Sequence, residues 1–391
     1  MIDDDAFDSA AGFAVEETLA AAGARQVTES ARDGAPPGGS IVLFPTNGVG
    51  FGHFTRQYAI ARRLKRLLPE TEVVFFTMMP VLHVPYDEGF KTYHISGRRK
   101  HGRDLSVEAW NRLLAGYLSL ILDQYQPWCF IFDGAFAYGG MLESIRNRPE
   151  TRKIWMRRAL SKRPQALPDA CIECFDEIVQ PDDALLTAGA ATGIEVTSCP
   201  PIVVLDRDEM LSRESARKRL GIAPDAKAVY VQLGAGRIND IHSEIRLTIE
   251  ALLKHPEVTV VLGESMLGSR LNITLDRVIS LRDYPNLLYY NAFDAVVQAG
   301  GYNAFHETRA CGLPALFYPN MRTSVDDQLA RCRVAEVEGW GRVVAERSAG
   351  PIDRAIEWLL SMEKQAPEHR LNGATVMAQR LARLCAAVTD R

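Results

Sequence analysis

The stretch IVLFPTNGVGFGHFTRQYAIARRL, residues 41–64, decides the fold, because it joins a strand, a glycine-rich loop and a helix. Residues 41–44 are all apolar and predict a buried strand. Tyr58, Ala61 and Leu64 recur at helical spacing and predict a helix with one buried face. Glycines occupy positions 48, 50 and 52 between the two. A strand that runs through glycines into a helix is typical of the first unit of a doubly wound α/β domain.

The alternation of strand and helix continues along the first half of the chain. Apolar runs predict further strands, and Leu114, Leu118 and Leu122 mark a helix between two of them. The predicted strands after the first are residues 72–77, 128–132, 153–156 and 177–179. This order predicts a parallel sheet covered by helices.

A second series of the same kind follows Pro201. Its predicted strands are residues 228–233, 258–262, 295–297 and 315–317, with helices near 240–255 and 326–337. We therefore expect two tandem Rossmann-like domains that face a central cleft, with ligands at the carboxyl ends of the strands. The predicted divisions are an acidic tail and linker over residues 1–38, domains over 39–200 and 201–366, and a last helix within 367–391.

Composition excludes several classes of protein. The 45 Lys and Arg against 49 Asp and Glu leave a net charge of -4, so no overall positive field favours nucleic acid or an anionic membrane. Seven scattered cysteines do not form the framework of a small secreted domain and favour a reducing cytoplasm. No apolar run reaches the roughly 20 residues of a membrane-spanning helix. We expect a cytoplasmic protein with no nucleic-acid partner.

The loop of the first half offers a candidate base. Gly50 and Gly52 leave backbone N–H groups exposed at the start of a helix. Their spacing does not match a dinucleotide-binding fingerprint, which disfavours a nicotinamide cofactor. His53 follows at the helix start, where the positive end of the helix favours the neutral imidazole that a general base needs. Asp133 ends an apolar strand and can hold that imidazole in one tautomer. The alternative is that His53 and Asp133 only cap helices.

The second half offers an anion site. Gly300 and Gly301 join a strand to a helix whose N-terminus Asn303 can cap, and a diphosphate fits such a turn. Glu307 is placed on the first turn of that helix, where it can accept both hydroxyls of a ribose. An ordinary cap or turn is the alternative for each of these residues.

Two further segments are expected at the same edge of the second sheet. The loop with Gly234, Gly236 and Arg237 can close over the same phosphates, where the Arg237 guanidinium can donate two parallel hydrogen bonds. Asp327 and Gln328 open the next helix, and their polar side chains suit the hydroxyls of a sugar. Arg62, Arg63, Lys65 and Arg66 are expected mostly on the outer face of the first helix.

Residues 50–56 resemble the G-x-G-H-x-x-R opening of GT-B glycosyltransferases related to the enzyme that adds N-acetylglucosamine to lipid I. Gly300 to Glu307, with Gly312, Pro314 and Gln328, resembles the donor signature of that group and of UDP-glycosyltransferases. The resemblance covers about residues 41–344.

The resemblance implies an inverting, metal-independent bacterial transferase that uses a nucleotide-diphosphate sugar, most often UDP-linked, and no other cofactor. Glu307 would hold the ribose, the Gly300–Gly301 turn the diphosphate, and Asp327 and Gln328 the sugar. The last helix would cross back to the first domain. A small-molecule or lipid-linked acceptor would donate a hydroxyl or amine to the base His53.

Other functions stay open. With water as the acceptor, the same fold is a nucleotide-sugar hydrolase, and without catalysis it is a partner subunit of another enzyme. The basic run Arg98 to Arg103 suits a phosphate-bearing or membrane-bound acceptor and peripheral membrane contact, but a solvated face is favoured.

Overall fold

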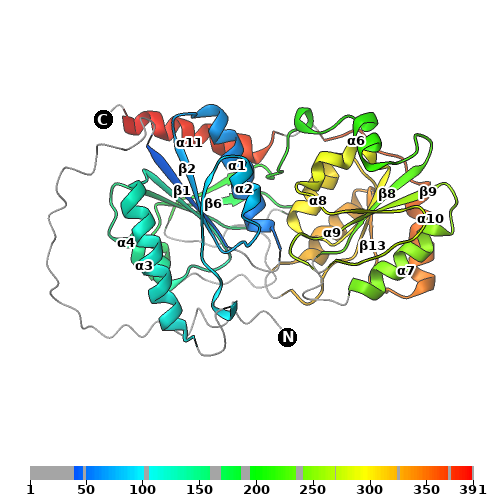
Figure 1. The fold of residues 1–391 in the computed structure, drawn as a ribbon, viewed down its shortest axis with the longest axis horizontal. Helices are drawn as coiled ribbons and strands as arrows, with labels where there is room; N and C mark the ends of the chain where they lie inside the picture. The colour runs from blue at the N-terminus through cyan, green and yellow to red at the C-terminus, as the bar shows by residue number, and fades with distance from the viewer. Residues whose placement is uncertain are drawn as a thin grey trace.

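The computed structural model describes residues 39–46, 50–100, 105–158, 169–185, 194–234, 241–268, 270–323, 326–368 and 371–389. The acidic tail predicted for residues 1–38 therefore lies outside the described residues. The chain forms two α/β domains that lie side by side (Figure 1).

The first domain contains a parallel seven-stranded sheet with the order β3-β2-β1-β4-β5-β6-β7. Residues of β1 alternate between the two faces of this sheet, so that Leu43 packs in one apolar cluster and Phe44 in the other. Both side chains are fully buried, and burial of each contributes about 1.5–3 kcal/mol. The strands are β1 (Ser40–Pro45), β2 (Glu72–Thr77), β3 (Lys91–His94), β4 (Cys129–Asp133), β5 (Arg152–Met156), β6 (Glu177–Pro181) and β7 (Val196–Cys199).

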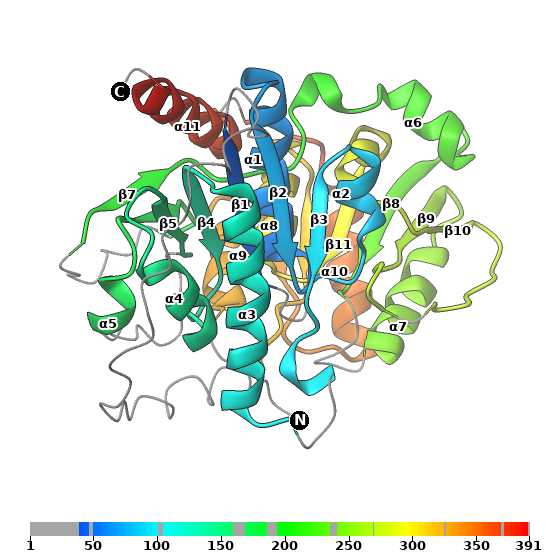
Figure 2. The same cartoon turned by 60° about the vertical axis from the view of Figure 1, so that its left-hand side comes forward.

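Helices cover both faces of this sheet, as the prediction of a doubly wound domain requires (Figure 2). They are α1 (Gly52–Leu67), α2 (His83–Asp87), α3 (Val107–Tyr125), α4 (Gly139–Arg146) and α5 (Asp169–Ile172). The α3 and α4 helices approach so closely that a Cβ on Gly140 would lie 2.0 Å from the carbonyl oxygen of Asn111. A glycine is needed at that crossing.

The second domain repeats the plan with a parallel six-stranded sheet in the order β10-β9-β8-β11-β12-β13. The strands are β8 (Lys227–Gln232), β9 (Val258–Gly263), β10 (Val278–Leu281), β11 (Ala295–Gln298), β12 (Ala315–Phe317) and β13 (Gly341–Val343). The helices are α6 (Arg213–Leu220), α7 (Ile241–Leu253), α8 (Tyr302–Ala310), α9 (Gln328–Val337) and α10 (Ala349–Ser361). Two tandem Rossmann-like domains are therefore confirmed.

The strand order identifies where ligands bind. It reverses between β1 and β4 in the first sheet and between β8 and β11 in the second. Doubly wound domains bind ligands at the carboxyl ends of the strands on either side of such a reversal. His53 follows β1 and Asp133 ends β4, while Gly234 follows β8 and Gly300 follows β11.

The last helix, α11 (Gly373–Thr389), packs along α1 of the first domain (Figure 1). Arg63 of α1 joins them, because its Nε donates to Thr375 Oγ1 at 3.0 Å. Its guanidinium also donates to the carbonyl of Val204 and pairs with Asp206 at 2.8 Å. The expected outer-face position is thus wrong for Arg63, which is 3% exposed and holds the linker and the last helix.

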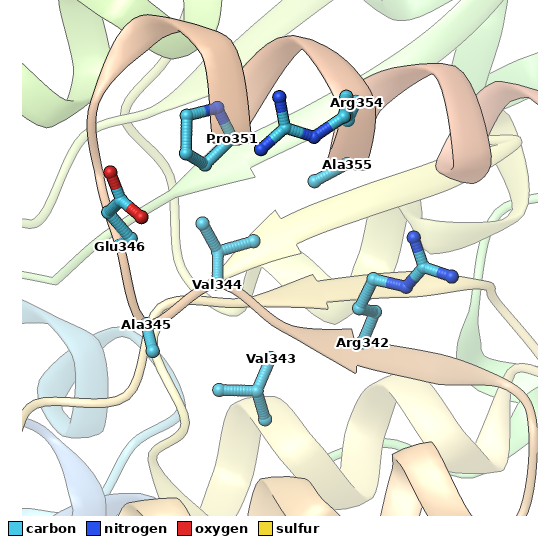
Figure 3. Close-up of a pocket in the computed structure, with 8 residues that line it drawn as sticks. All are labelled: Arg342, Val343, Val344, Ala345, Glu346, Pro351, Arg354 and Ala355. Atoms are coloured by element: carbon cyan, nitrogen blue, oxygen red, sulfur yellow. The ribbon is translucent and has the colours of Figure 1, made fainter.

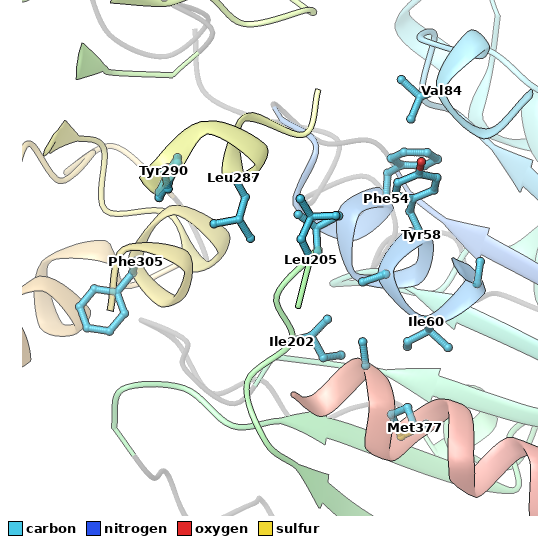
Figure 4. Packing of buried hydrophobic residues seen from close by; sticks show 14 of the residues in the cluster. Phe54, Tyr58, Ile60, Val84, Ile202, Leu205, Leu287, Tyr290, Phe305 and Met377 are labelled. Atoms are coloured by element: carbon cyan, nitrogen blue, oxygen red, sulfur yellow. The ribbon is translucent and has the colours of Figure 1, made fainter. Parts of the chain in front are cut away.

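One apolar cluster spans both domains. Leu205 of the interdomain segment lies between Leu287 of the second domain and the α1 side chains Phe54 and Tyr58 (Figure 4). Ile202 lies toward Met377 of α11 in the same cluster. This shared packing holds the carboxyl ends of the two sheets together.

Candidate active site between the two domains

His53 and Asp133, which lie 80 residues apart, meet at the carboxyl edge of the first sheet. His53 is the second residue of α1, and Asp133 ends β4 opposite Pro45 of β1. The His53 Nδ1 atom lies 2.7 Å from Asp133 Oδ1. The structure thus brings together the two residues predicted as base and orienting carboxylate.

Arg56 joins this pair, although its side chain was not among the predicted site residues. Its Nε donates to Asp133 Oδ2 at 3.0 Å and its Nη2 donates to Asp133 Oδ1 at 2.6 Å. Arg56 and Asp133 are both fully buried, whereas the His53 side chain is 16% exposed. The signal in the sequence was the spacing, since position 56 is one helical turn beyond His53.

The geometry favours the tautomer of His53 that a base needs. His53 Nδ1 lies 2.7 Å from Asp133 Oδ1 and 2.9 Å from Arg56 Nη2, which itself donates to Asp133 Oδ1 at 2.6 Å. Because the shorter contact of Nδ1 is with a carboxylate oxygen, which can only accept, a proton on Nδ1 is favoured there. With the proton there, Nδ1–H donates to Asp133 and Nε2 keeps its lone pair. The pKa of His53 is lowered by burial, which outweighs the opposing effect of Asp133 and is reinforced by Arg56 and Arg158. His53 is therefore neutral near pH 7 and able to accept a proton.

The pKa of Asp133 stays below its usual value in spite of burial, because Arg56 and His53 both stabilise the carboxylate. Asp133 thus remains an anion beside His53 and can stabilise the imidazolium that forms when His53 takes up a proton. Gly50 and Gly52 border His53 in the chain, and a Cβ on Gly50 would meet no described atom within 4 Å. Among the described residues, nothing therefore covers the backbone at Gly50.

The glycine turn of the second domain leads directly into α8. A Cβ on Gly301 would meet no atom of the described residues within 4 Å, whereas one on Gly300 would lie 2.3 Å from Cys332 Sγ. Gly301 is thus open, and Gly300 allows α9 to pack against the turn. The helix cap is Gly301 without a side-chain bond, so the prediction that Asn303 caps α8 is wrong. The Asn303 Oδ1 is buried and has no hydrogen-bond partner among the described atoms.

Glu307 lies on the second turn of α8, not on the first as predicted. Its side chain is only partly exposed, and no described residue pairs with its carboxyl group. Burial raises the pKa of Glu307 to about 8. Burying a carboxyl group that has no described partner costs free energy, and such a group is suited to accept hydrogen bonds from ligand hydroxyls.

The other predicted donor residues differ in what surrounds them. Gly234 has φ +100°, a backbone conformation that favours glycine, and a Cβ there would meet no described atom within 4 Å. Asp327 caps α9 by accepting from Ala330 N at 3.0 Å, and Gln328 is buried with its Oε1 accepting from Asn320 N at 2.9 Å. Both therefore have structural partners, and their contact with a sugar stays a prediction. Gly236 and Arg237 lie outside the described residues, as do residues 101–104 of the basic loop.

The two domains meet at the start of α8. Tyr302 Oη donates to the carbonyl of Asp182 at 3.0 Å and accepts from Ile202 N at 3.2 Å. The Arg56 guanidinium lies 5.4 Å from the centre of the Tyr302 ring, within range of a cation–π interaction. Tyr302 thus follows the glycine turn of the second domain directly in the chain, and its ring lies next to Arg56, the partner of the candidate base in the first domain.

A separate small pocket of about 210 Å³ lies between β13 and α10 and contains none of the predicted site residues (Figure 3). Its lining is formed by Arg342, Val343, Val344, Ala345, Glu346, Pro351, Arg354 and Ala355. Within the described ranges, no three His, Cys, Asp or Glu side chains group as a metal site would require. No described helix is both long and apolar enough to span a membrane.

No protein-family model matches the chain. No curated protein matches it either. Solved structures do match over nearly the whole chain. The spinosyn rhamnosyltransferase SpnG is 14% identical over 89% of this chain and 96% of that chain, with a TM-score of 0.57. The calicheamicin glycosyltransferase CalG4 is 13% identical over 90% of this chain and 95% of that chain, with a TM-score of 0.56. MurG of Acinetobacter baumannii is 12% identical over 89% of this chain and 99% of that chain, with a TM-score of 0.53.

SpnG has also been solved in complex with thymidine diphosphate and in complex with the spinosyn aglycone. At 12–14% identity, the likeness to these proteins concerns the fold. The chain has the two-domain fold of GT-B glycosyltransferases, and that prediction from the sequence is confirmed.

Proposed function

We propose that the protein is a glycosyltransferase that moves a sugar from a nucleoside-diphosphate donor to a hydroxyl or amine acceptor, with inversion and without a metal ion. The observation that carries the proposal is the carboxyl group of Glu307, with which no described residue pairs and which lies on the second turn of α8, beyond the open N-terminus at Gly301. An anion at the helix start and a diol beside the second turn are the diphosphate and ribose of one ligand.

The donor would be held by the second domain. The helix N-terminus at Gly301 favours a diphosphate by about 0.3–2 kcal/mol before specific hydrogen bonds are counted. Each hydroxyl that donates to an ionised Glu307 adds roughly 1.5–3 kcal/mol. The complex of SpnG with thymidine diphosphate, on the same fold, agrees with a pyrimidine nucleotide, and we propose UDP or TDP as the nucleotide part.

The transfer step uses His53 and Asp133 at the carboxyl edge of the first sheet. His53 Nε2 takes the proton of the acceptor O–H or N–H while that atom forms the bond to the anomeric carbon of the sugar. The bond from this carbon to the diphosphate breaks, and the nucleoside diphosphate leaves with its electron pair at the α8 N-terminus. Asp133 holds Nδ1–H and stabilises the imidazolium, and such general-base assistance contributes about 10²- to 10⁴-fold in rate.

A thermal-shift screen with UDP, TDP, ADP and GDP tests donor binding. A nucleotide present at one hundred times its Kd stabilises the folded protein by about 2.7 kcal/mol, so a true ligand raises the Tm clearly. We expect UDP or TDP to raise it and the purine nucleotides to leave it unchanged. If none of the four raises the Tm, the proposed function is refuted.

Turnover is then tested with the matching nucleotide sugars and the His53→Ala variant. We expect this variant to lose at least 10²-fold in kcat and to bind the nucleotide as the wild type does, because His53 lies in the other domain from the donor turn. Wild-type turnover by His53→Ala would show that His53 is not the base. Release of free sugar without an added acceptor would identify a nucleotide-sugar hydrolase instead.

A further inference from the structure

A buried ion-pair bridge crosses between the two domains at a point that the transfer step does not use. Arg331 of α9 donates from Nε to Asp183 Oδ1 and from Nη2 to Asp183 Oδ2, both at 2.7 Å. Asp183 follows β6 of the first domain, 148 residues away in the chain. Both side chains are 0% exposed. An Arg and an Asp in this two-bond geometry fix each other in distance and in orientation.

The same guanidinium reaches the turn that we assign to the donor diphosphate. Arg331 Nη1 donates to the carbonyl oxygen of Gly300 at 2.9 Å. The Gly300 C=O and the Gly301 N–H belong to one planar trans peptide unit, so the two bonds point in opposite directions. A bond that fixes the carbonyl toward Arg331 therefore aims the Gly301 N–H away from Arg331. The Cα of the same residue is also open, because a Cβ on Gly301 would meet no described atom within 4 Å.

A second carboxylate completes the bridge. Asp326 Oδ1 accepts from Arg331 Nη2 at 2.8 Å and pairs with Arg158 Nη1 at 3.0 Å. Arg158 follows β5 of the first domain, so this link also crosses between the domains. Burial would raise the pKa of Asp326, but Arg158 and Arg331 hold it at about 2, and the carboxylate stays ionised.

We propose that Arg331 is a positioning residue that holds the Gly300–Gly301 peptide in the orientation that binds the donor diphosphate, and that Asp183 of the acceptor domain holds Arg331 in place. The inference rests on the proposed function for the identity of the ligand. It implies that the donor turn is in its binding geometry only while the two domains are together. Apolar side chains of similar size often stabilise a protein as much as a buried Arg–Asp pair does, so the pair is weak evidence for a purely stabilising role.

The test is the Arg331→Lys variant, which keeps the positive charge next to Asp183 and Asp326. A lysine ammonium has no planar fork, so it cannot hold both oxygens of Asp183 and the Gly300 carbonyl at once. Arg309→Lys is the matched control, because Arg309 lies toward the other end of α8 and pairs with Glu338 at 2.8 Å and Glu368 at 3.3 Å. Asp183→Asn, which is nearly isosteric, breaks the bridge from the side of the first domain.

Two measurements are made at a temperature at which circular dichroism shows each variant to be fully folded. Calorimetry gives the Kd for UDP and TDP, which we expect to rise about tenfold in Arg331→Lys and in Asp183→Asn and to stay unchanged in Arg309→Lys. Hydrogen exchange of the free protein is expected to be faster for the peptide that covers residues 296–306 in the first two variants only.

The outcomes separate the inference from the proposed function. A wild type that binds neither nucleotide refutes the proposed function, and with it the diphosphate as the ligand of this turn, while exchange still shows whether Arg331 orders the turn. If the wild type binds and both bridge variants bind equally well, the positioning role is refuted. It is also refuted if exchange of the 296–306 peptide is unchanged, because the turn is then held without Arg331.

Discussion

Nucleotide binding is expected to depend on the ionisation of Glu307. Burial raises the pKa of Glu307 to about 8 in the free protein, so at pH 7 roughly one molecule in eleven carries the carboxylate. In the ionised form each carboxylate oxygen can accept from one ribose hydroxyl in a charge-assisted bond, whereas protonation turns one oxygen into a donor and removes the charge, so the ionised form binds the ribose more tightly. The apparent Kd is then the intrinsic Kd divided by the ionised fraction, which makes binding weaker by about 2-fold at pH 8, 11-fold at pH 7 and 100-fold at pH 6.

Calorimetric titrations of UDP and TDP at pH 6, 7, 8 and 9 into the wild type and Glu307→Gln measure this dependence. The terminal phosphate of the nucleotide titrates near pH 6 and affects both proteins alike. The ratio of the Kd of Glu307→Gln to that of the wild type therefore isolates Glu307. We expect this ratio to rise about ninefold from pH 6 to 7 and about fivefold from pH 7 to 8, and then to level off. At pH 7 about 0.9 proton should be released for each nucleotide bound, measured in buffers of different ionisation enthalpy.

The free protein gives an independent check through its stability. Because the folded-state pKa of Glu307 lies above the ordinary glutamate value, the unfolded state ionises first as the pH rises. The neutral form of Glu307 contributes fully to the free energy of unfolding below about pH 4.5, and this contribution is lost as the pH rises to about 8. Glu307→Gln should remove that loss and unfold at higher denaturant concentration than the wild type at pH 9. A Kd ratio that is constant from pH 6 to 9 would refute the assignment of Glu307 to the ribose.

Three further predictions follow from single contacts. Asp133→Asn should lower kcat at least 10²-fold with little change in nucleotide Kd, measured in the transfer assay, because the amide can no longer stabilise protonated His53; an unchanged kcat would contradict this role. Gly301→Ala should fold normally yet weaken nucleotide binding, whereas Gly300→Ala should lose about 1–3 kcal/mol in urea unfolding, because its Cβ would lie 2.3 Å from a buried sulfur of α9; equal stability of the two variants would contradict this contrast. Gly373→Ala should destabilise the docking of α11, because its Cβ would lie 1.9 Å from a backbone oxygen of the interdomain segment, and faster hydrogen exchange along α11 checks this.

The central strands of both sheets could be predicted from the sequence because they are buried on both faces. The run that became β4 is apolar at every position before Asp133 and reads as a strand without ambiguity. The edge strands could not be predicted in this way. In β3 all four residues are exposed or partly exposed, and β7 buries only its last residue, so neither shows an apolar run. Their pairing is set by the neighbouring strand rather than by their own pattern.

The candidate site was predictable where topology alone determines proximity. Parallel strands end at one edge, which is why His53 and Asp133 could be paired before any coordinates were considered. Arg56 was harder to assign, since an arginine on an amphipathic helix usually faces solvent. The bond between Asp183 and Arg331 links the two domains, and no local pattern reports how one domain is oriented on the other. Contacts of that kind require the structure.

A second histidine lies next to a buried aspartate near the candidate site, and exposure indicates which of the two is better suited to act as the proposed base. His306 Nε2 lies 3.4 Å from Asp183 Oδ1, and its side chain is only 4% exposed. His53 lies 2.7 Å from Asp133 and is 16% exposed. A base must touch the atom that it deprotonates, and an acceptor can reach a ring that is partly open but not one enclosed between two domains. Burial lowers the pKa of both histidines, so the neutral form alone does not distinguish them. Access to the acceptor does, and it supports the proposal that His53 rather than His306 takes up the proton.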